Sequence, residues 1–326
     1  MLDYVIRGGS IVDGTGRPAA TGDIGVRDGV IVAVGSVDEP AREVIDADGA
    51  LVTPGWIDVH THYDGQVSWD DVLDPSAGNG ATTVVMGNCG VGFAPVRPGN
   101  EKKLIELMEG VEDIPGTALH EGIEWGRWET FPEYLDYIAG RRYSLDIGAQ
   151  IAQGGLPVKR VLQLGAQIAQ GALRYYLMGE RGARNEDATP DDLTTMSKLV
   201  VEALAAGAAG FSTSRTIGHR ALDGSPVPGT FAPDAEIDAL AAAMRAAGRG
   251  VFEMIPAGTV GKLERLGGER FTPESELALM AEFSRRSGRP VTFTLVKSPD
   301  YDPETWRNIL DMVVEANDTG ARLFPQ

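Results

Sequence analysis

Residues 51–64, with the sequence LVTPGWIDVHTHYD, decide how the rest of the chain is interpreted. An apolar run leads into His60 and His62, which are two of only four histidines in the chain. Side chains two positions apart on a β-strand share a face, so both imidazoles are expected to point the same way. Imidazole pairs suit zinc and similar divalent ions. The stretch therefore predicts a metal site, although two unrelated histidines at a polar strand end would give the same pattern.

From residue 55 onward, strand-like and helix-like segments alternate, which is typical of βα units. The predicted strands are 56–60, 82–86, 144–150, 208–212, 250–255, 290–296 and 321–324. The main predicted helices are 190–206, 235–247, 273–287 and 303–316. This pattern amounts to six complete βα pairs and the start of a seventh, so an eight-stranded barrel cannot close on this sequence alone. We therefore expect the chain to be a fragment of a longer polypeptide, truncated near strand seven.

Residues 1–54 hold short β-branched runs separated by Asp-Gly steps such as Asp28-Gly29, which are hairpin signals. They predict a small N-terminal β-sandwich domain, followed by a barrel domain over residues 55–326. An insertion at about 95–142 interrupts the barrel after its second strand. Insertions of this size usually build a lid or part of a pocket.

The segment GAQIAQG occurs twice, at 148–154 and again at 165–171. The repeat is too short and too isolated for a solenoid, so it indicates a local duplication. Only one copy can form the third barrel strand, and the sequence alone does not say which.

The segment PGWIDVHTHYDGQ, residues 54–66, resembles the first-strand signature of the amidohydrolase superfamily, and in particular the branch of N-acyl-D-amino-acid deacylases (D-aminoacylases). The resemblance implies an α/β fold, a metal-dependent (β/α)8-type barrel holding one or two ions of zinc or another divalent metal. It also implies that residues 1–54 are one half of a composite sandwich whose other half comes from the C-terminus. The implied reaction is hydrolysis of the amide bond of N-acylated D-amino acids.

The resemblance also suggests metal ligands. Cys89, in an Asn-Cys-Gly segment after the second strand, matches a zinc-ligating cysteine of this branch. A thiolate is a strong zinc ligand, but a lone free cysteine also behaves as a small buried hydrophobe. Glu253 stands where the branch has a strand-five histidine, and it is either a substitute ligand or a strand-end acid paired with a base such as Arg249. Gln153 and Gln170 stand where the family commonly has a histidine.

The substrate-side candidates are His219 and Arg220, in a long loop rich in glycine and proline after the fourth strand. Arginine grips carboxylates with two hydrogen bonds, and an N-acyl amino acid offers a carboxylate. Lys297, after the sixth strand, is a third candidate. Ordinary surface positions would explain each of these residues as well. The catalytic aspartate of the superfamily follows strand eight and is expected beyond Gln326.

Composition limits the partners and the compartment. The formal net charge of -18 argues against nucleic acid or an anionic membrane surface as a partner. One cysteine excludes an internal disulfide and fits a reducing compartment. The N-terminus lacks the layout of a signal peptide, and no apolar run is long enough to span a bilayer. We expect a cytoplasmic protein, and the sequence does not specify its oligomeric state.

The leading interpretation is a metal-dependent hydrolase of non-peptide C–N (amide) bonds, similar to N-acyl-D-amino-acid deacylases. Its partner would be a small-molecule substrate, an N-acyl amino acid. One alternative is hydrolysis of a cyclic amide, ureide or lactone on the same scaffold. The other is a catalytically inactive fragment or binding module, which the missing histidines on strands five and six favour.

Overall fold

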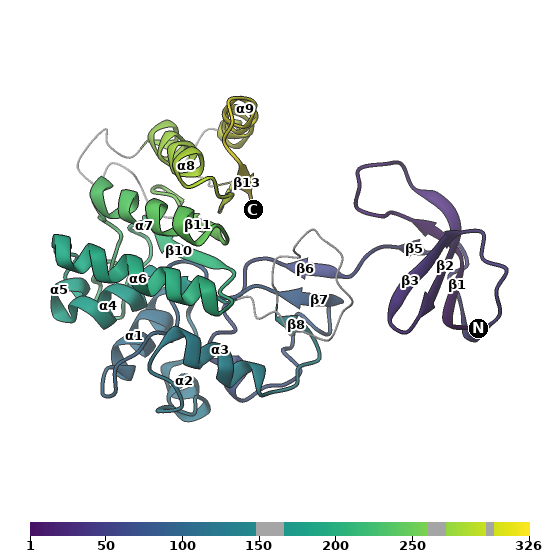
Figure 1. The fold of residues 1–326 in the computed structure, drawn as a ribbon, viewed down its shortest axis with the longest axis horizontal. Helices are drawn as coiled ribbons and strands as arrows, with labels where there is room; N and C mark the ends of the chain where they lie inside the picture. The colour runs from purple at the N-terminus through teal and green to yellow at the C-terminus, as the bar shows by residue number, and fades with distance from the viewer. Residues whose placement is uncertain (148–165, 260–271, 298–302) are drawn as a thin grey trace. The chain divides into compact units, whose positions relative to one another are not determined.

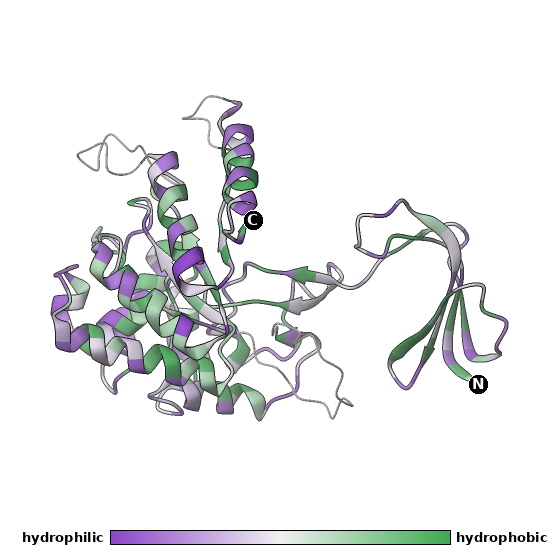
Figure 2. Ribbon diagram, turned by 45° about the horizontal axis from the view of Figure 1, so that its top comes forward, coloured by the Kyte–Doolittle hydropathy of each residue, from purple (hydrophilic) through white to green (hydrophobic). Residues whose placement is uncertain are grey.

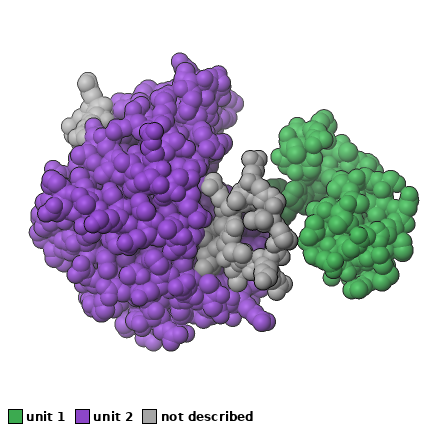
Figure 3. Space-filling model, viewed as in Figure 1, with its two compact units in different colours: residues 1–56 green, residues 57–326 purple. Residues whose placement is uncertain are grey.

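The computed structural model describes residues 1–147, 166–259, 272–297 and 303–326. The chain divides into two compact units, Met1–Trp56 and Ile57–Gln326, which Figure 3 colours separately. Within the described ranges, no helix is long and apolar enough to cross a membrane.

The first unit is a five-stranded mixed sheet. Its strands are β1 (Leu2–Ile11), β2 (Ala20–Arg27), β3 (Val30–Gly35), β4 (Ala41–Asp46) and β5 (Leu51–Val52). Their order is β3-β2-β1-β4, with β5 pairing with β1. The predicted hairpin is confirmed, because Asp28 and Gly29 both adopt positive φ angles, 52° and 74°, between the antiparallel strands β2 and β3. The small core holds Leu2, Val5 and Val37.

The side chains of β3 are mostly exposed, among them Val30, Ile31 and Val34. The apolar character of this strand is visible in Figure 2 as a green ribbon. The described residues of the unit form one sheet. The second sheet that a sandwich requires therefore stays a prediction.

The second unit is built on parallel strands. They are β6 (Trp56–Asp58), β7 (Ala81–Val84), β8 (Asp146–Ile147), β9 (Gln167–Ala169), β10 (Gly210–Ser214), β11 (Val251–Ile255), β12 (Val291–Phe293) and β13 (Leu323–Pro325). One sheet has the order β6-β7-β8 and the other β13-β12-β11-β10-β9. A parallel bridge between Met86 and Ala166 connects them. The predicted alternation of parallel strands and helices is confirmed.

All the helices named next belong to this unit, as Figure 1 shows. They are α1 (Glu101–Glu112), α2 (Gly116–Gly122), α3 (Phe131–Ala139), α4 (Gln170–Met178), α5 (Glu180–Ala183), α6 (Pro190–Ala206), α7 (Asp234–Ala247), α8 (Pro273–Ser287) and α9 (Thr305–Asp318), with a short 3-10 turn η1 (Gln66–Ser68). The bounds of α6 and α8 match the predicted ranges 190–206 and 273–287. Each helix begins with a proline, and the threonine just before it caps the helix N-terminus. Helices α1 to α3 make up most of the predicted insertion.

The repeat is explained by the register beside β7. Asp146 lies opposite Thr83 and Ile147 opposite Val84. Continued without a break, this register would place residue 149 opposite Met86, but Ala166 lies there. The difference, 166 − 149 = 17, equals the offset between the two repeat copies, 165 − 148 = 17. The second copy therefore takes the strand position as β9, while the first copy, with Gln153, lies outside the described residues.

Close packing of β10 against its neighbours fixes the centre of the sheet. The rings of Phe211, Phe252 and Phe283 stack in succession, with centroids 6.0 and 4.0 Å apart. At Gly210 an added Cβ would lie 1.9 Å from the carbonyl oxygen of Val251, so only glycine fits there. This packing fixes the strand ends from which the site is built.

Candidate metal centre

The two histidines lie just after β6, not on it. The predicted strand continued to His60, but β6 ends at Asp58, so this prediction is wrong by two residues. A regular parallel ladder would pair the His60 N–H with the Val85 carbonyl. The Thr61 N–H donates to that oxygen instead, at 3.0 Å, which inserts one extra residue as a bulge. The His60 N–H turns back to the Asp58 carboxylate, at 3.4 Å.

Despite the bulge, three of the four predicted ligands converge, namely His60, His62 and Cys89. The His60 Nε2 atom lies 3.2 Å from the Cys89 Sγ atom, and the His62 Nε2 atom lies 3.6 Å from it. One ligand atom from each of the three residues lies within 4.8 Å of the other two. Two imidazoles and a thiol that meet in this way form a donor set suited to zinc.

The backbone around Cys89 is shaped to present the thiol. Cys89 itself has a φ of 58°, in the left-handed region that side chains other than glycine rarely adopt. At Gly87 a Cβ would lie 2.2 Å from the Gln167 carbonyl oxygen. Asn88 is fully buried and donates to the carbonyls of Thr61 and Val85, at 3.1 and 3.0 Å. These contacts join the cysteine turn to the histidine segment.

The electrostatics fit a cation site. Burial, with smaller contributions from His60 and His219, lowers the pKa of His62 to about 3, so its ring is neutral. Burial, then the carboxylates of Glu253 and Glu112, raise the pKa of the Cys89 thiol well above its usual value. A metal ion would replace the thiol proton. Within the described ranges, His62 Nδ1, Glu112 Oε1 and Glu253 Oε1 are buried without a hydrogen-bond partner.

Two residues of the centre escaped the sequence analysis. Glu112, the last residue of α1, places its Oε2 atom 3.2 Å from His62 Nε2, and burial raises the pKa of this carboxyl to about 7. The Gln326 Oε1 atom lies 2.7 Å from His60 Nδ1. An amide oxygen only accepts, so His60 carries its proton on Nδ1 and leaves Nε2 free for a metal. The sequence around either residue carries no motif that marks it.

Glu253 contacts the backbone of Cys89. Its Oε2 atom accepts a hydrogen bond from the Cys89 backbone N–H at 3.2 Å, and its side chain is fully buried. Arg249, the base considered as its partner, is exposed at the protein surface. Glu253 is not one of the three residues whose ligand atoms all meet within 4.8 Å. Its role as a ligand stays a prediction.

The three substrate-side candidates separate in space. His219 is half-buried, bonds Ser214 Oγ through Nδ1 at 3.0 Å, and interacts electrostatically with His60. Arg220 is exposed and donates to the Gly224 carbonyl within its own loop, at 2.6 Å. Lys297 lines a hollow of about 60 Å³ at the ends of β11 and β12, whose lining includes none of the four predicted ligands. Of the three, His219 is the one that interacts electrostatically with His60 and His62.

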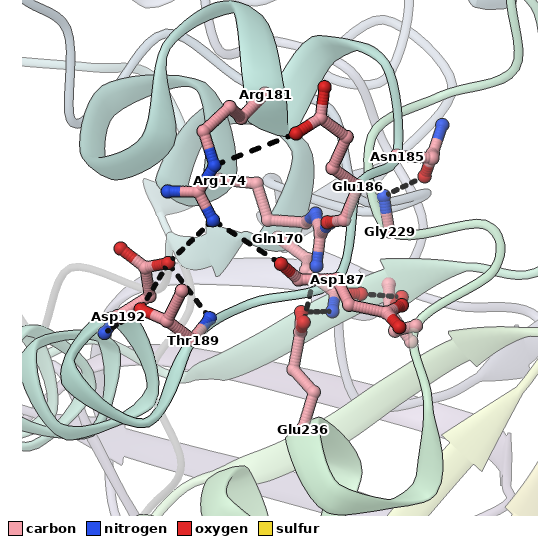
Figure 4. A network of polar contacts seen from close by, with 12 residues as sticks. Gln170, Arg174, Arg181, Asn185, Glu186, Asp187, Thr189, Asp192, Gly229 and Glu236 are labelled. Atoms are coloured by element: carbon pink, nitrogen blue, oxygen red, sulfur yellow. Dashed lines mark hydrogen bonds and ion pairs between the residues drawn. The ribbon is translucent and has the colours of Figure 1, made fainter.

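Gln170 belongs to a buried polar network that holds the strand ends together. It accepts a hydrogen bond from the Thr213 hydroxyl and donates to Glu236. Glu236 in turn pairs with Arg174, and the two side chains are 0% and 1% exposed. Figure 4 shows Glu236 meeting both Gln170 and Arg174. The network connects α4, β10 and α7.

Comparison with known proteins gives the same family. A model of the amidohydrolase family matches residues 43–324. The N-acyl-D-glutamate deacylase of Alcaligenes xylosoxydans xylosoxydans is 30% identical over 251 residues, which cover 76% of this chain and 42% of that protein. A D-aminoacylase structure from work on its binuclear metal centre superposes with a TM-score of 0.73 and 26% identity, covering 100% of this chain and 58% of that one.

The N-acyl-D-glutamate deacylase of Bordetella bronchiseptica, solved with zinc and a phosphonate inhibitor, superposes with a TM-score of 0.69 and 28% identity. The match covers 99% of this chain and 58% of that structure. The chain thus spans little more than half the length of these solved relatives. Together with the convergence of His60, His62 and Cys89, the match over residues 43–324 shows that the chain belongs to the amidohydrolase family.

Proposed function

We propose that this chain forms the metal-binding part of a hydrolase that cleaves the amide bond of N-acyl-D-amino acids. The observation that carries the proposal is the convergence of His60, His62 and Cys89 on one point. The names of its relatives, D-aminoacylase and N-acyl-D-aspartate and N-acyl-D-glutamate deacylases, support the substrate class.

The three converging residues would hold one zinc or similar divalent ion, and His62, Glu112 and Glu253 keep buried polar atoms free around it. A bound ion supplies Lewis-acid chemistry, which polarises an amide carbonyl and acidifies water. The Gln326 amide bonds His60 Nδ1 and would orient the ring so that Nε2 binds the ion. His219, beside the pair, would contact the acylated substrate.

The finer architecture is part of the proposal. The parallel strands would belong to a (β/α)8-type barrel, with the metal at the carboxyl ends of its strands, where such enzymes keep their active sites. Residues 1–54 would form half of an accessory sandwich. The single cysteine suits a reducing compartment, so we place the protein in the cytoplasm.

The test begins with metal content per chain, measured by inductively coupled plasma mass spectrometry on protein purified without added metal or chelator. We expect about one zinc per chain in the parent protein and a large loss in Cys89→Ala. Ser284→Ala, another small buried side chain, is the control and should keep the metal. Unchanged zinc in Cys89→Ala would remove this residue from the centre.

A substrate panel then separates the candidate reactions. It contains N-acetyl-D-amino acids, their L enantiomers, a dihydropyrimidine, a hydantoin and a lactone. Hydrolysis of the D-amides supports the proposal, whereas turnover of the cyclic substrates alone would replace it with the cyclic-amide alternative. A folded chain that binds no metal would favour the other alternative, a catalytically inactive fragment or binding module.

A further inference from the structure

We propose that Glu112, the last residue of α1, is a fourth protein ligand of the ion that His60, His62 and Cys89 hold. The inference rests on the proposed function, since it concerns the same ion. It assigns a chemical role to the insertion between β7 and β8, which contributes this side chain from a helix and not from a strand end.

The distances around His62 match those of a metal site. The Glu112 Oε2 atom lies 3.2 Å from His62 Nε2, and the Cys89 Sγ atom lies 3.6 Å from the same nitrogen. Around a tetrahedral zinc ion, ligand bond lengths place a nitrogen and an oxygen about 3.4 Å apart and a nitrogen and a sulfur about 3.6 Å apart. These two separations match the two edges of such a tetrahedron that meet at His62 Nε2. Glu112 itself is not one of the three residues whose ligand atoms all lie within 4.8 Å of one another.

The side of the ring that Glu112 contacts excludes a purely orienting role. A carboxylate that only orients a metal-binding histidine bonds the ring nitrogen that points away from the metal. At His60, Gln326 bonds the ring nitrogen that points away from the metal, Nδ1. At His62 the equivalent atom, Nδ1, is buried without a partner, while Glu112 contacts Nε2, the nitrogen that faces Cys89. Glu112 thus points into the space between the ligands.

The charge of Glu112 also calls for a cation. It is the last residue of α1, at the negative end of the helix dipole, and the last turn holds no basic residue. Its side chain is 18% exposed and its Oε1 atom is buried without a partner. Within the described ranges its one ion-pair contact is His62. One thiolate and one carboxylate beside two neutral imidazoles carry two negative charges, which balance a divalent ion.

The experiment measures zinc affinity by competition with a chromophoric chelator on the full chain. Glu112→Gln keeps the shape of the side chain and a hydrogen-bond acceptor but removes the anionic ligand. We expect it to weaken zinc binding by more than about 100-fold, beyond the loss typical of an outer partner. The control is Asp113→Asn, which removes the same charge from the exposed next residue, where asparagine tolerates the left-handed φ of 55°. It should change affinity less than threefold.

A second variant keeps the test decisive if Glu112→Gln does not fold. Glu112→His offers an imidazole of similar reach, and X-ray absorption at the zinc edge counts imidazole ligands. We expect three imidazoles in this variant and two in the parent. A count of two in Glu112→His would overturn the proposal.

The outcomes also separate this inference from the proposed function. A parent chain that binds no zinc contradicts the proposed function itself. A parent that binds zinc, with a Glu112→Gln variant less than 100-fold weaker, leaves the three-residue site in place. That result would overturn only the assignment of Glu112 as a ligand.

Discussion

Deleting residues 148–164 removes one copy of the repeat and joins Ile147 directly to residue 165. In the shortened chain, Ala166 follows Ile147 by two positions, as Met86 follows Val84 on the neighbouring strand. The register observed on both sides of the gap, Ile147 opposite Val84 and Ala166 opposite Met86, is therefore preserved without movement of either segment. We predict that the deletion variant folds and is more stable than the parent.

The expected gain follows from the length of chain removed. Eighteen residues, 148–165, separate Ile147 from Ala166 along the sequence. Loop closure over that number of residues costs about 2.5 kcal/mol in chain entropy, and the deletion leaves only residue 165 between the two segments. In a chain of 326 residues one kcal/mol corresponds to about 1.5 °C, so the melting temperature should rise by roughly 4 °C.

The assay is thermal unfolding followed by circular dichroism, with urea unfolding as a second measure. The matched control deletes residues 148–163, one fewer, which shifts Ala166 by one place against Met86. A shift of one residue turns every side chain of a strand to the opposite face, so this variant should be destabilised or fail to fold. Equal behaviour of the two deletions, or a lower melting temperature for the 148–164 deletion, would show that β8 and β9 do not share one strand position.

Three further predictions concern the buried network and the metal. Arg174→Met leaves Glu236 buried without its charge partner and should cost about 3–5 kcal/mol of unfolding free energy, measured in urea. The control Arg181→Met, at a side chain 38% exposed, should cost less than about 1 kcal/mol, and similar losses would contradict the burial argument. Gln326→Leu removes the acceptor of the His60 ring and should weaken zinc binding about 10- to 100-fold in the chelator competition; unchanged affinity would rule out this orienting role. If free zinc is present at about 1,000 times its dissociation constant, removing it should cost about 4 kcal/mol of stability, seen as a lower melting temperature. No change would mean that folding and metal binding are uncoupled.

Much of the fold could be predicted from the sequence because its signals are local. Helices α6 and α8 match their predicted bounds, since a capping threonine, a proline and an apolar stripe all lie within the segment itself. Cys89 and the histidine pair could be singled out because few residue types bind zinc and this chain has few of them.

The errors lie where contacts between distant segments decide the outcome. The end of β6 depends on a competition between the Asp58 carboxylate and the Val85 carbonyl for backbone N–H groups, which periodicity does not reveal. Glu112 is one glutamate among many until tertiary packing brings α1 to His62.

The order of the site residues along the chain separates two properties of the protein. The donors proposed for the ion, from His60 to Glu112, all precede β8, whereas His219 follows β10. The later strands reach the ion mainly through Glu253, which supports the Cys89 backbone, and through the Gln326 contact with His60. Under this proposal, metal affinity would be set mostly by one short region of sequence, and the fit of the substrate by another. Relatives could change substrate in the loop after β10 without rebuilding the metal centre, which is consistent with a family that hosts several amide substrates on one scaffold.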